Sequence, residues 1–152
     1  MSFCQKNLCV KVWARRRGDA ERAGTKRMED LLTDQIINAA IEVHRVLGAP
    51  GLLESLYEEA LLYELQLRRI PVQSQVLIPV SYKKKILKDP MRMDLLIDRR
   101  VIVEVKATEQ LHPVYKAQLL TYLRLIGLKL GLILNFGQTL LVDGIVRVVN
   151  QL

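Results

Sequence analysis

The stretch MRMDLLIDRRVIVEVK, residues 91–106, decides the fold because it has the pattern of a β-hairpin. Two runs rich in apolar and β-branched residues flank a polar DRR triplet, which is the signal of two strands joined by a short loop. A three-residue loop pairs Ile97 with Val101. The register of the whole hairpin follows from that pair, because a slip by one residue would turn every side chain to the other face.

Four charged side chains share one face of this predicted hairpin. Side chains alternate between the two faces of a strand, so counting back from the loop places Asp94 opposite Glu104 and Arg92 opposite Lys106. Facing carboxylates have β-carbons about 5 Å apart and destabilise a sheet unless something compensates them. A divalent cation with oxygen ligands is one candidate, with Lys106 holding a water or a phosphate beside it. The alternative is a half-exposed strand face with scattered charges, and the spacing alone favours neither.

Three motifs give residues 28–152 a resemblance to known nucleases. Asp94 followed by EVK at residues 104–106 resembles the D…(D/E)xK core of the PD-(D/E)XK nuclease superfamily. QLLTY at residues 118–122 resembles the QxxxY motif of its RecB-type members, and GLLESLY at residues 51–57 resembles the signature of its small bacterial GxxExxY family. The resemblance implies an α/β (α+β) fold of the restriction-endonuclease type, a mixed sheet flanked by helices with the core order α-β-β-β-α-β.

The same resemblance implies a nuclease that hydrolyses phosphodiester bonds with Mg²⁺, for which Mn²⁺ would substitute. Asp94, Glu104 and the carbonyl of Val105 would be metal ligands. Lys106 would orient or activate the attacking water and offset developing negative charge.

Residues from two predicted helices complete the implied site. A carboxylate of the first core helix often reaches the metal in this superfamily; Glu54 is preferred because it belongs to the GxxExxY signature, and Glu58, four residues on, comes second. Gln118 would support the metal-bound water or the substrate phosphate, and Tyr122 would back it from the same helix face.

The chain departs from the resembled pattern at three positions. Met93 precedes Asp94 where the motif has Pro, and many members tolerate this. Tyr115 stands where relatives have His, so any role of that His is lost here. Lys84 replaces a Gly common after Tyr-Lys in the family, which affects mainly the shape of a turn.

The remaining elements follow from periodicity and from turn residues. Thr33 is a plausible N-cap for a helix over residues 34–47, in which His44 is expected to be a hydrogen-bonded structural residue. The other predicted elements are a helix over 53–69, a strand over 72–82, a helix over 113–126 begun by Pro113, a strand over 130–135 and a closing hairpin of 139–142 with 144–149.

Length and composition bound the class of protein. A chain of 152 residues with 50% apolar residues forms one domain with a real core, and it has no apolar run long enough for a membrane span. The start lacks the pattern of a secretory signal, so we expect a cytoplasmic protein. Cys4 and Cys9 lie outside the recognisable domain, their spacing fits no metal site, and a structural disulfide is not expected in that compartment.

Positive charge is concentrated at the N-terminus. Residues 1–27 hold eight Lys and Arg against two Asp and Glu, a net +6, whereas residues 28–152 hold fifteen against fourteen, a net +1. Residues 1–27 show no sustained period and are expected to be a disordered or loosely attached basic extension. Within the domain a lysine run at residues 83–85, with Lys88, remains; such a run is more often a solvated turn than a phosphate track.

Three functions stay open from the sequence alone. The intact motifs favour a nuclease acting on nucleic acid, with DNA preferred to RNA. A non-catalytic module of the same fold that binds protein or nucleic acid is the main alternative, with the acids bridged by Arg92 or Lys106. The third is a small homodimer that is active only with its partner.

Overall fold

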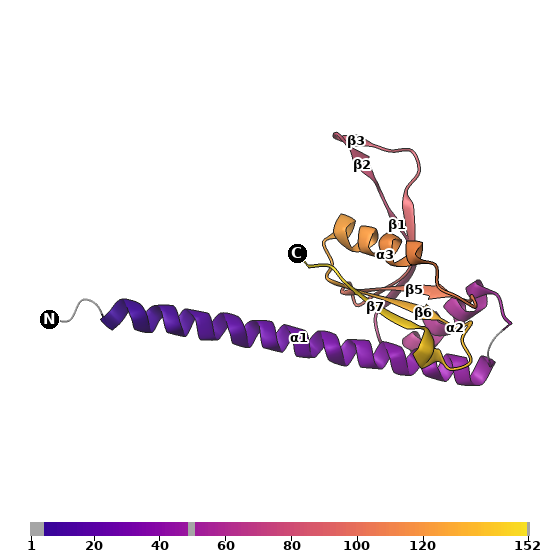
Figure 1. The fold of residues 1–152 in the computed structure, drawn as a ribbon, viewed down its shortest axis with the longest axis horizontal. Coiled ribbons are helices and arrows are strands. Elements are labelled where there is room, and N and C mark those ends of the chain that lie inside the picture. The colour runs from indigo at the N-terminus through magenta and orange to yellow at the C-terminus, as the bar shows by residue number, and fades with distance from the viewer. Residues whose placement is uncertain (1–4, 49–50, 152) are drawn as a thin grey trace. The chain divides into compact units, whose positions relative to one another are not determined.

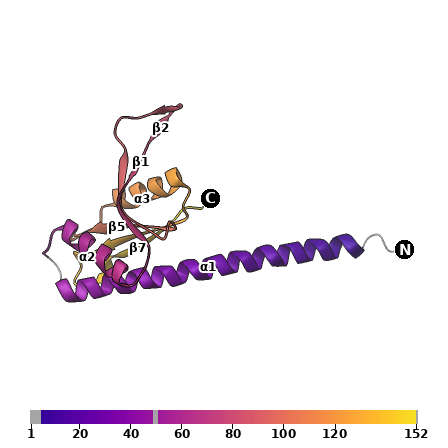
Figure 2. The same ribbon diagram turned by 180° about the vertical axis from the view of Figure 1, so that it is seen from behind.

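The computed structural model describes residues 5–48 and 51–151 (Figures 1 and 2). It divides into two compact units with a boundary between Gln35 and Ile36. The helices are α1 (Gln5–Leu47), α2 (Glu54–Leu67), α3 (Pro113–Ile126) and a 3₁₀ turn, η1 (Leu141–Gly144). The strands are β1 (Val72–Ile78), β2 (Ser81–Tyr82), β3 (Lys85–Ile86), β4 (Met91–Ile97), β5 (Val101–Lys106), β6 (Leu130–Asn135) and β7 (Ile145–Val149). None of the helices in the described ranges is long and apolar enough to cross a membrane.

Helix α1 begins far upstream of the predicted start at residue 34. Thr33 is not an N-cap: its hydroxyl donates to the carbonyl of Glu29 at 2.8 Å, a bond made inside a continuous helix. Residues 5–27 belong to the same helix, because the segment contains no Pro and is rich in Arg, Lys and Ala, which favour helix. Cys4 lies outside the described residues, as does the side chain of Cys9.

A five-stranded mixed sheet of order β1-β4-β5-β6-β7 organises the second unit, which confirms the predicted fold class. β4 pairs antiparallel with β1 and β5, β5 pairs parallel with β6, and β7 closes the sheet antiparallel to β6. All residues of β5 and β6 are buried, as expected for strands covered on both faces. β5 is therefore the rigid centre on which a site can be built.

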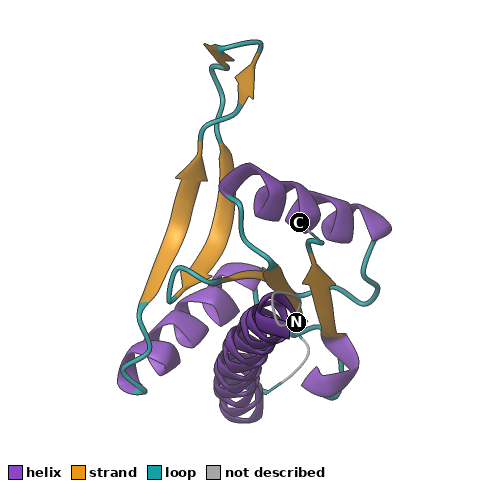
Figure 3. Cartoon of the chain, turned by 90° about the vertical axis from the view of Figure 1, so that its left-hand side faces the viewer, coloured by secondary structure: helices purple, strands orange, loops and turns teal. Residues whose placement is uncertain are grey.

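Helices α2 and α3 cover opposite faces of this sheet (Figure 3). On the α3 side, Leu119, Tyr122 and Leu123 pack in one apolar cluster with Ile102 and Ile133 of the two central strands. On α2, Tyr57 is fully buried, stacks on Phe136 with ring centroids 4.6 Å apart, and donates its hydroxyl to the carbonyl of Gly48 at 3.1 Å. The Tyr of the GLLESLY signature is thus a packing residue.

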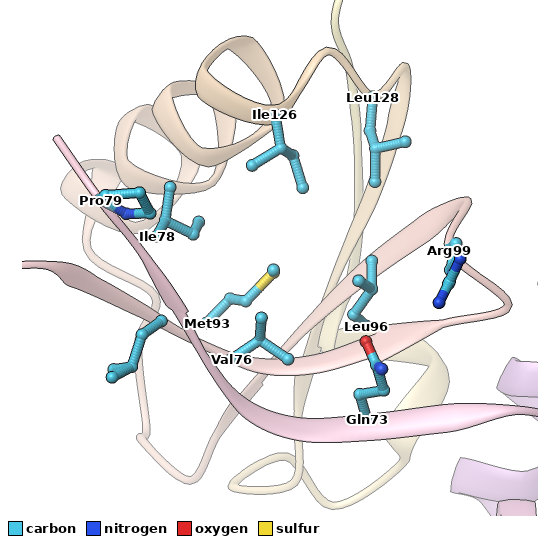
Figure 4. A pocket seen from close by; sticks show the side chains of 10 residues that line it. Gln73, Val76, Ile78, Pro79, Met93, Leu96, Arg99, Ile126 and Leu128 are labelled. Atoms are coloured by element: carbon cyan, nitrogen blue, oxygen red, sulfur yellow. The ribbon is translucent and has the colours of Figure 1, made fainter. Parts of the chain in front are cut away.

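The side chains of β1 and β4 do not alternate regularly along their whole length, contrary to the prediction. The paired residues step from Ser74↔Leu95 to Val76↔Met93 and leave out Gln75 and Asp94. Gln75 has a left-handed φ of 53°, which breaks the pleat. Met93 and Leu96 consequently line one apolar groove, although strict alternation would put them on opposite faces (Figure 4).

Two predictions about strands are wrong: one strand is shorter than predicted, and one hairpin does not form. The strand expected over 72–82 stops at Ile78, because Pro79 has no N–H for the ladder, and Ser81–Tyr82 instead pairs with Lys85–Ile86 in a separate two-stranded hairpin. No closing hairpin forms over 139–149: Leu141–Gly144 is a 3₁₀ turn and β7 pairs with β6, whose open edge takes the strand.

Candidate functional site

The two central acids meet where β4 and β5 stop pairing. The ladder ends at Leu95↔Val103, and beyond it the side chains take over the hydrogen bonds. The N–H of Asp94 donates to Oε1 of Glu104 at 3.3 Å, and the N–H of Val105 donates to Oδ2 of Asp94 at 2.9 Å. The prediction that Asp94 and Glu104 face each other on adjacent antiparallel strands is confirmed.

Arg92 does not take the position that the register predicted for it. Its guanidinium points to β1, where Nη1 lies 3.5 Å from Oε1 of Gln75. The strands have opened before this point, so Arg92 and Lys106 do not form a cross-strand pair. Of the two basic residues expected to bridge the acids, only Lys106 does so.

The ammonium of Lys106 lies at the centre of the site. Nζ is 3.2 Å from Oε1 of Glu54, 3.9 Å from Oδ2 of Asp94 and 3.9 Å from Oε2 of Glu104. It also donates to the carbonyl of Val105 at 2.9 Å. One cation therefore contacts carboxylates from α2, β4 and β5, and these three carboxylates outnumber it.

Burial and mutual repulsion dominate the electrostatics of the acids. Glu104 is only 5% exposed, and burial, reinforced by the neighbouring Asp94 carboxylate, raises its pKa to about 8. Burial likewise raises the pKa of Asp94, although the bond from Val105 N–H and the charge of Lys106 act the other way. Burial would lower the pKa of Lys106, but the three surrounding carboxylates outweigh it, so that pKa is raised. Lys106 thus stays charged while the negative charge around it is incompletely neutralised.

Gln118 and Tyr122 form a pair on the inner face of α3, as their spacing predicted. Nε2 of Gln118 donates to the hydroxyl of Tyr122 at 2.6 Å. Tyr122 is 2% exposed, and burial together with the charge of Glu104 raises its pKa. The pair thus lies within the electrostatic reach of the acids.

Tyr115 is a site residue to which the sequence analysis assigned no role. Its ring lies under the ammonium of Lys106, with Nζ 5.3 Å from the ring centroid, a cation–π distance. The available signal was its helical spacing, since Tyr115, Gln118 and Tyr122 follow one another at intervals of three and four on a single helix face.

The two acids of α2 have different surroundings. Glu54 pairs with Lys106, whereas Oε1 of Glu58 accepts from Nε2 of Gln75 at 2.6 Å. Burial raises the pKa of Glu58, and the charges of Asp94 and Glu54 add to the rise. Glu58 thus feels the site while being tied to β1 through Gln75, a contact that the sequence did not reveal.

Asn135 fixes the chain where it leaves β5. Asn135 pairs with Lys106 across the parallel strands and is fully buried. Its Oδ1 accepts from the N–H groups of Thr108 and Gly137, each at 3.0 Å, and its Nδ2 donates to the carbonyl of Thr108 at 2.8 Å. Nearby, the ring nitrogen Nε2 of His44 lies 2.9 Å from the carbonyl of Gln138, so His44 has the structural role expected of it.

A mixed sheet between helices, with paired acids and a lysine on adjacent central strands, defines a nuclease-like α+β domain. The family model of the PD-(D/E)XK nuclease superfamily matches residues 30–148, and the chain belongs to this superfamily. A search of curated proteins gave no match, and a search of solved structures gave none either.

Members of this superfamily generally use divalent metals, and the donor set here suits one. Carboxylate oxygens of Asp94 and Glu104 and the carbonyl of Val105 are hard oxygen ligands of the kind that Mg²⁺ prefers. The raised pKa values of the two acids show that their ionised forms are disfavoured in the absence of a further positive charge, which a dication would supply. Within residues 5–48 and 51–151, no three His, Cys, Asp or Glu side chains are grouped as a ready metal site, and the ammonium of Lys106 lies among the acids instead.

Proposed function

We propose that this protein is a metal-dependent nuclease of the GxxExxY branch that hydrolyses phosphodiester bonds of DNA in preference to RNA. The observation that carries the proposal is the charge constellation at the open end of β4 and β5: one ammonium surrounded by three carboxylates, of which Glu104 is buried and Asp94 is partly buried. Buried like charges are costly, so a domain keeps such a group where chemistry uses it.

Asp94, Glu104 and the Val105 carbonyl would hold Mg²⁺, or Mn²⁺ in its place, with Glu54 as the next ligand and Glu58 as the more remote one. When bound, the metal supplies charge neutralisation at the phosphate and a water of lowered pKa. Glu54 would exchange its contact with Lys106 for the metal, which its partly exposed side chain permits.

Lys106 would orient the attacking water and offset negative charge that develops on the phosphate. The three carboxylates around it favour the ammonium form, so it acts as a hydrogen-bond donor and a cation. The Tyr115 ring beneath Nζ and the bond to the Val105 carbonyl restrict where this long side chain can point.

Gln118 would hold the water or a phosphate oxygen, with Tyr122 as its support. The bond from Gln118 Nε2 to the Tyr122 hydroxyl fixes the amide, whose carbonyl can accept from the water and whose second N–H can donate to a phosphate oxygen. Tyr122 is a positioning residue here, because it acts through Gln118.

A second candidate function is a non-catalytic binding module with a structural ion-pair cluster. The distances of 3.2 to 3.9 Å from Lys106 Nζ to three carboxylates favour it, because they give each acid a positively charged neighbour without any metal. In that case removal of one carboxylate should leave charge unpaired, and no divalent ion should change the melting temperature.

Calorimetric titration of Mg²⁺ and Mn²⁺ into the wild type and Asp94→Asn, followed by a cleavage screen on varied DNA and RNA, tests the proposal. We expect binding by the wild type, loss of at least tenfold in affinity for Asp94→Asn, and no change for Asp143→Asn, a matched exposed carboxylate. Equal heats for all three proteins, together with an inert cleavage screen, would favour the binding module.

A further inference from the structure

The β2–β3 hairpin projects from the sheet (Figures 1 and 3). It also carries most of the net positive charge of its unit. Residues 36–152 hold fifteen Lys and Arg against eleven Asp and Glu, a net +4. Residues 79–90 alone hold four Lys against one Asp, a net +3. The hairpin is thus a local cationic arm on a domain that is otherwise close to neutral.

Both residues of the hairpin turn are lysines in a backbone conformation that lysine rarely adopts. Tyr82 pairs with Lys85, so Lys83 and Lys84 form a two-residue loop, with φ values of 46° and 70°. Such loops strongly favour Asn-Gly, because lysine at positive φ is strained. The comparable turn at Asp98-Arg99 begins with an Asp, which tolerates this conformation and also pairs with Arg100. Two lysines at strained positions point to a use for their charge.

The structure shows no ion pair between the lysines of the arm and an acidic side chain among the described residues. Among the described residues, no salt bridge involves Lys83, Lys84, Lys85 or Lys88, and the one contact made by these ammonium groups is Lys83 Nζ over the Tyr82 ring at 5.4 Å. Tyr82 itself is 62% exposed. Exposed lysines beside an exposed aromatic ring form the combination that binds phosphates and stacks on bases.

The arm rises from the same end of the sheet as the candidate site. The pair Ile78↔Met91 closes the β1–β4 ladder at the root of the arm, and Asp94 follows Met91 by three residues. β5 runs antiparallel to β4, so Lys106 at its end lies at this end as well. Ten residues separate Lys84 from Asp94, so the tip reaches at most about 35 Å from the site. At about 3.4 Å per base pair, that reach is roughly one turn of duplex DNA.

We infer that the β2–β3 hairpin is a substrate-holding arm whose lysines bind the phosphate backbone of DNA within one helical turn of the bond at the active site. The inference rests on the proposed function for the identity of the ligand. It goes beyond that function by assigning DNA-binding energy to an element that contributes no catalytic group.

The test is DNA binding by the full-length protein in EDTA, with a fluorescein-labelled 30-base-pair duplex followed by anisotropy at several salt concentrations. Lys83→Asn/Lys84→Gly gives the turn its preferred residues and removes two charges. We expect the dissociation constant at 0.15 M salt to rise roughly tenfold or more and the salt slope to fall by up to about 1.8, while the melting temperature stays equal or rises. Lys116→Gln/Lys129→Gln, which removes the same charge from α3 and the loop after it, should change affinity by less than about twofold.

Several outcomes would overturn the inference. Unchanged affinity in the turn variant would exclude the arm as a DNA contact. Equal losses of affinity in both variants would mean that binding depends on the net charge of the protein and not on the position of the arm. Unchanged DNA affinity with lost binding to phosphatidylserine vesicles would assign the arm to a membrane surface. Asp94→Asn is measured in parallel. If this variant does not cleave DNA but still binds it through the arm, the inference about the arm holds and only catalysis is affected. If the wild type cleaves DNA and the turn variant binds it equally well, the proposed nuclease function is kept and the inference about the arm is rejected.

Discussion

Asp94 and Glu104 each hydrogen-bond to the backbone of the other's strand. Glu104 Oε1 accepts from the N–H of Asp94, and Asp94 Oδ2 accepts from the N–H of Val105, the residue after Glu104. These bonds replace the next rungs of the β4–β5 ladder and hold both carboxylates in place. The hairpin thus stabilises an arrangement that charge alone would push apart.

Stability of the metal-free protein should fall as the pH rises. The pKa of Glu104 is raised from 4.5 to about 8, so the folded state holds a proton that the unfolded state has released. The stabilisation is complete below pH 4.5 and is lost as the pH rises through about 8; the raised pKa values of Asp94 and Glu58 act in the same direction. Each unit of difference corresponds to about 1.4 kcal/mol.

Urea unfolding in EDTA from pH 5 to 9 measures this effect. Glu104→Gln should flatten the decline and exceed the wild type at pH 9, whereas the exposed control Glu109→Gln should follow the wild type. A wild-type curve that is flat or rising over this range would contradict the assignment of Glu104 as a strained buried carboxylate.

Replacement of Lys106 by Met should separate metal binding from catalysis. Lysine is no metal ligand, so Mn²⁺ affinity should be kept or strengthened once the ammonium has left the three carboxylates. Cleavage should drop at least about 100-fold, because the group that offsets developing charge is lost. Without metal the variant should lose roughly 3 kcal/mol, because buried acids are left unpaired. Weaker Mn²⁺ binding than in the wild type would show that Lys106 supports the ligands in another way.

Tyr122→Phe and Gln118→Leu should have similar, non-additive effects on rate. Each removes the 2.6 Å bond that fixes the Gln118 amide, which costs about 1 kcal/mol of stability. We expect a drop of about tenfold in kcat with metal affinity unchanged, and the double variant should resemble Gln118→Leu alone. Additive losses measured in single-turnover kinetics would mean that Tyr122 has a role independent of Gln118.

Truncation of the chain to Met28 should leave the melting temperature of the domain nearly unchanged. Among the side chains that the structure describes in α1, the buried ones begin at Leu32, so the truncation keeps all of them. Scanning calorimetry of the full chain and the truncated form measures the effect. A drop of many degrees would show that residues 1–27 pack against the domain.

Gly137→Ala should destabilise the loop that anchors β5. A Cβ at this position would lie 2.3 Å from the carbonyl oxygen of Thr108 and 2.6 Å from its nitrogen, both backbone atoms that cannot move aside. We expect a loss of about 2–3 kcal/mol in chemical unfolding. Gly24→Ala is the control, because its Cβ would meet nothing within 4 Å and helical Ala is favoured over Gly. An equally stable Gly137→Ala would mean that the Asn135–Thr108 clasp tolerates displacement.

The sequence predicts the site best where one local rule acts alone. The DRR loop sets Ile97 against Val101, as predicted, and that pair fixes Asp94 beside Glu104. The bounds of α3 are also as predicted, because Pro113 suits its first turn and Gly127 adopts the left-handed conformation at its end.

Tertiary contacts decide what the sequence could not. The apolar residues of α3 surround the helix, so periodicity alone does not separate the exposed Val114 and Leu125 from the buried Leu119. The inner face is selected by Gly131 of β6, where a Cβ would come within 2.9 Å of Leu119, so the helix packs where the strand lacks a side chain. Gln75 gives no sequence signal for positive φ, so the break in alternation beside Asp94 was not predictable.

Because the Ile78↔Met91 pair ends the β1–β4 ladder, the segment between these two residues can be replaced without a change in the ladder itself. The β1–β4 ladder is already closed at this pair, so residues 79–90 could be shortened to a tight turn or lengthened without a shift in the register of Asp94. Natural variation in this segment would then alter which substrates are captured while the hydrolytic machinery stays constant. A designer could exploit the same junction by grafting a different recognition hairpin onto an unchanged catalytic sheet.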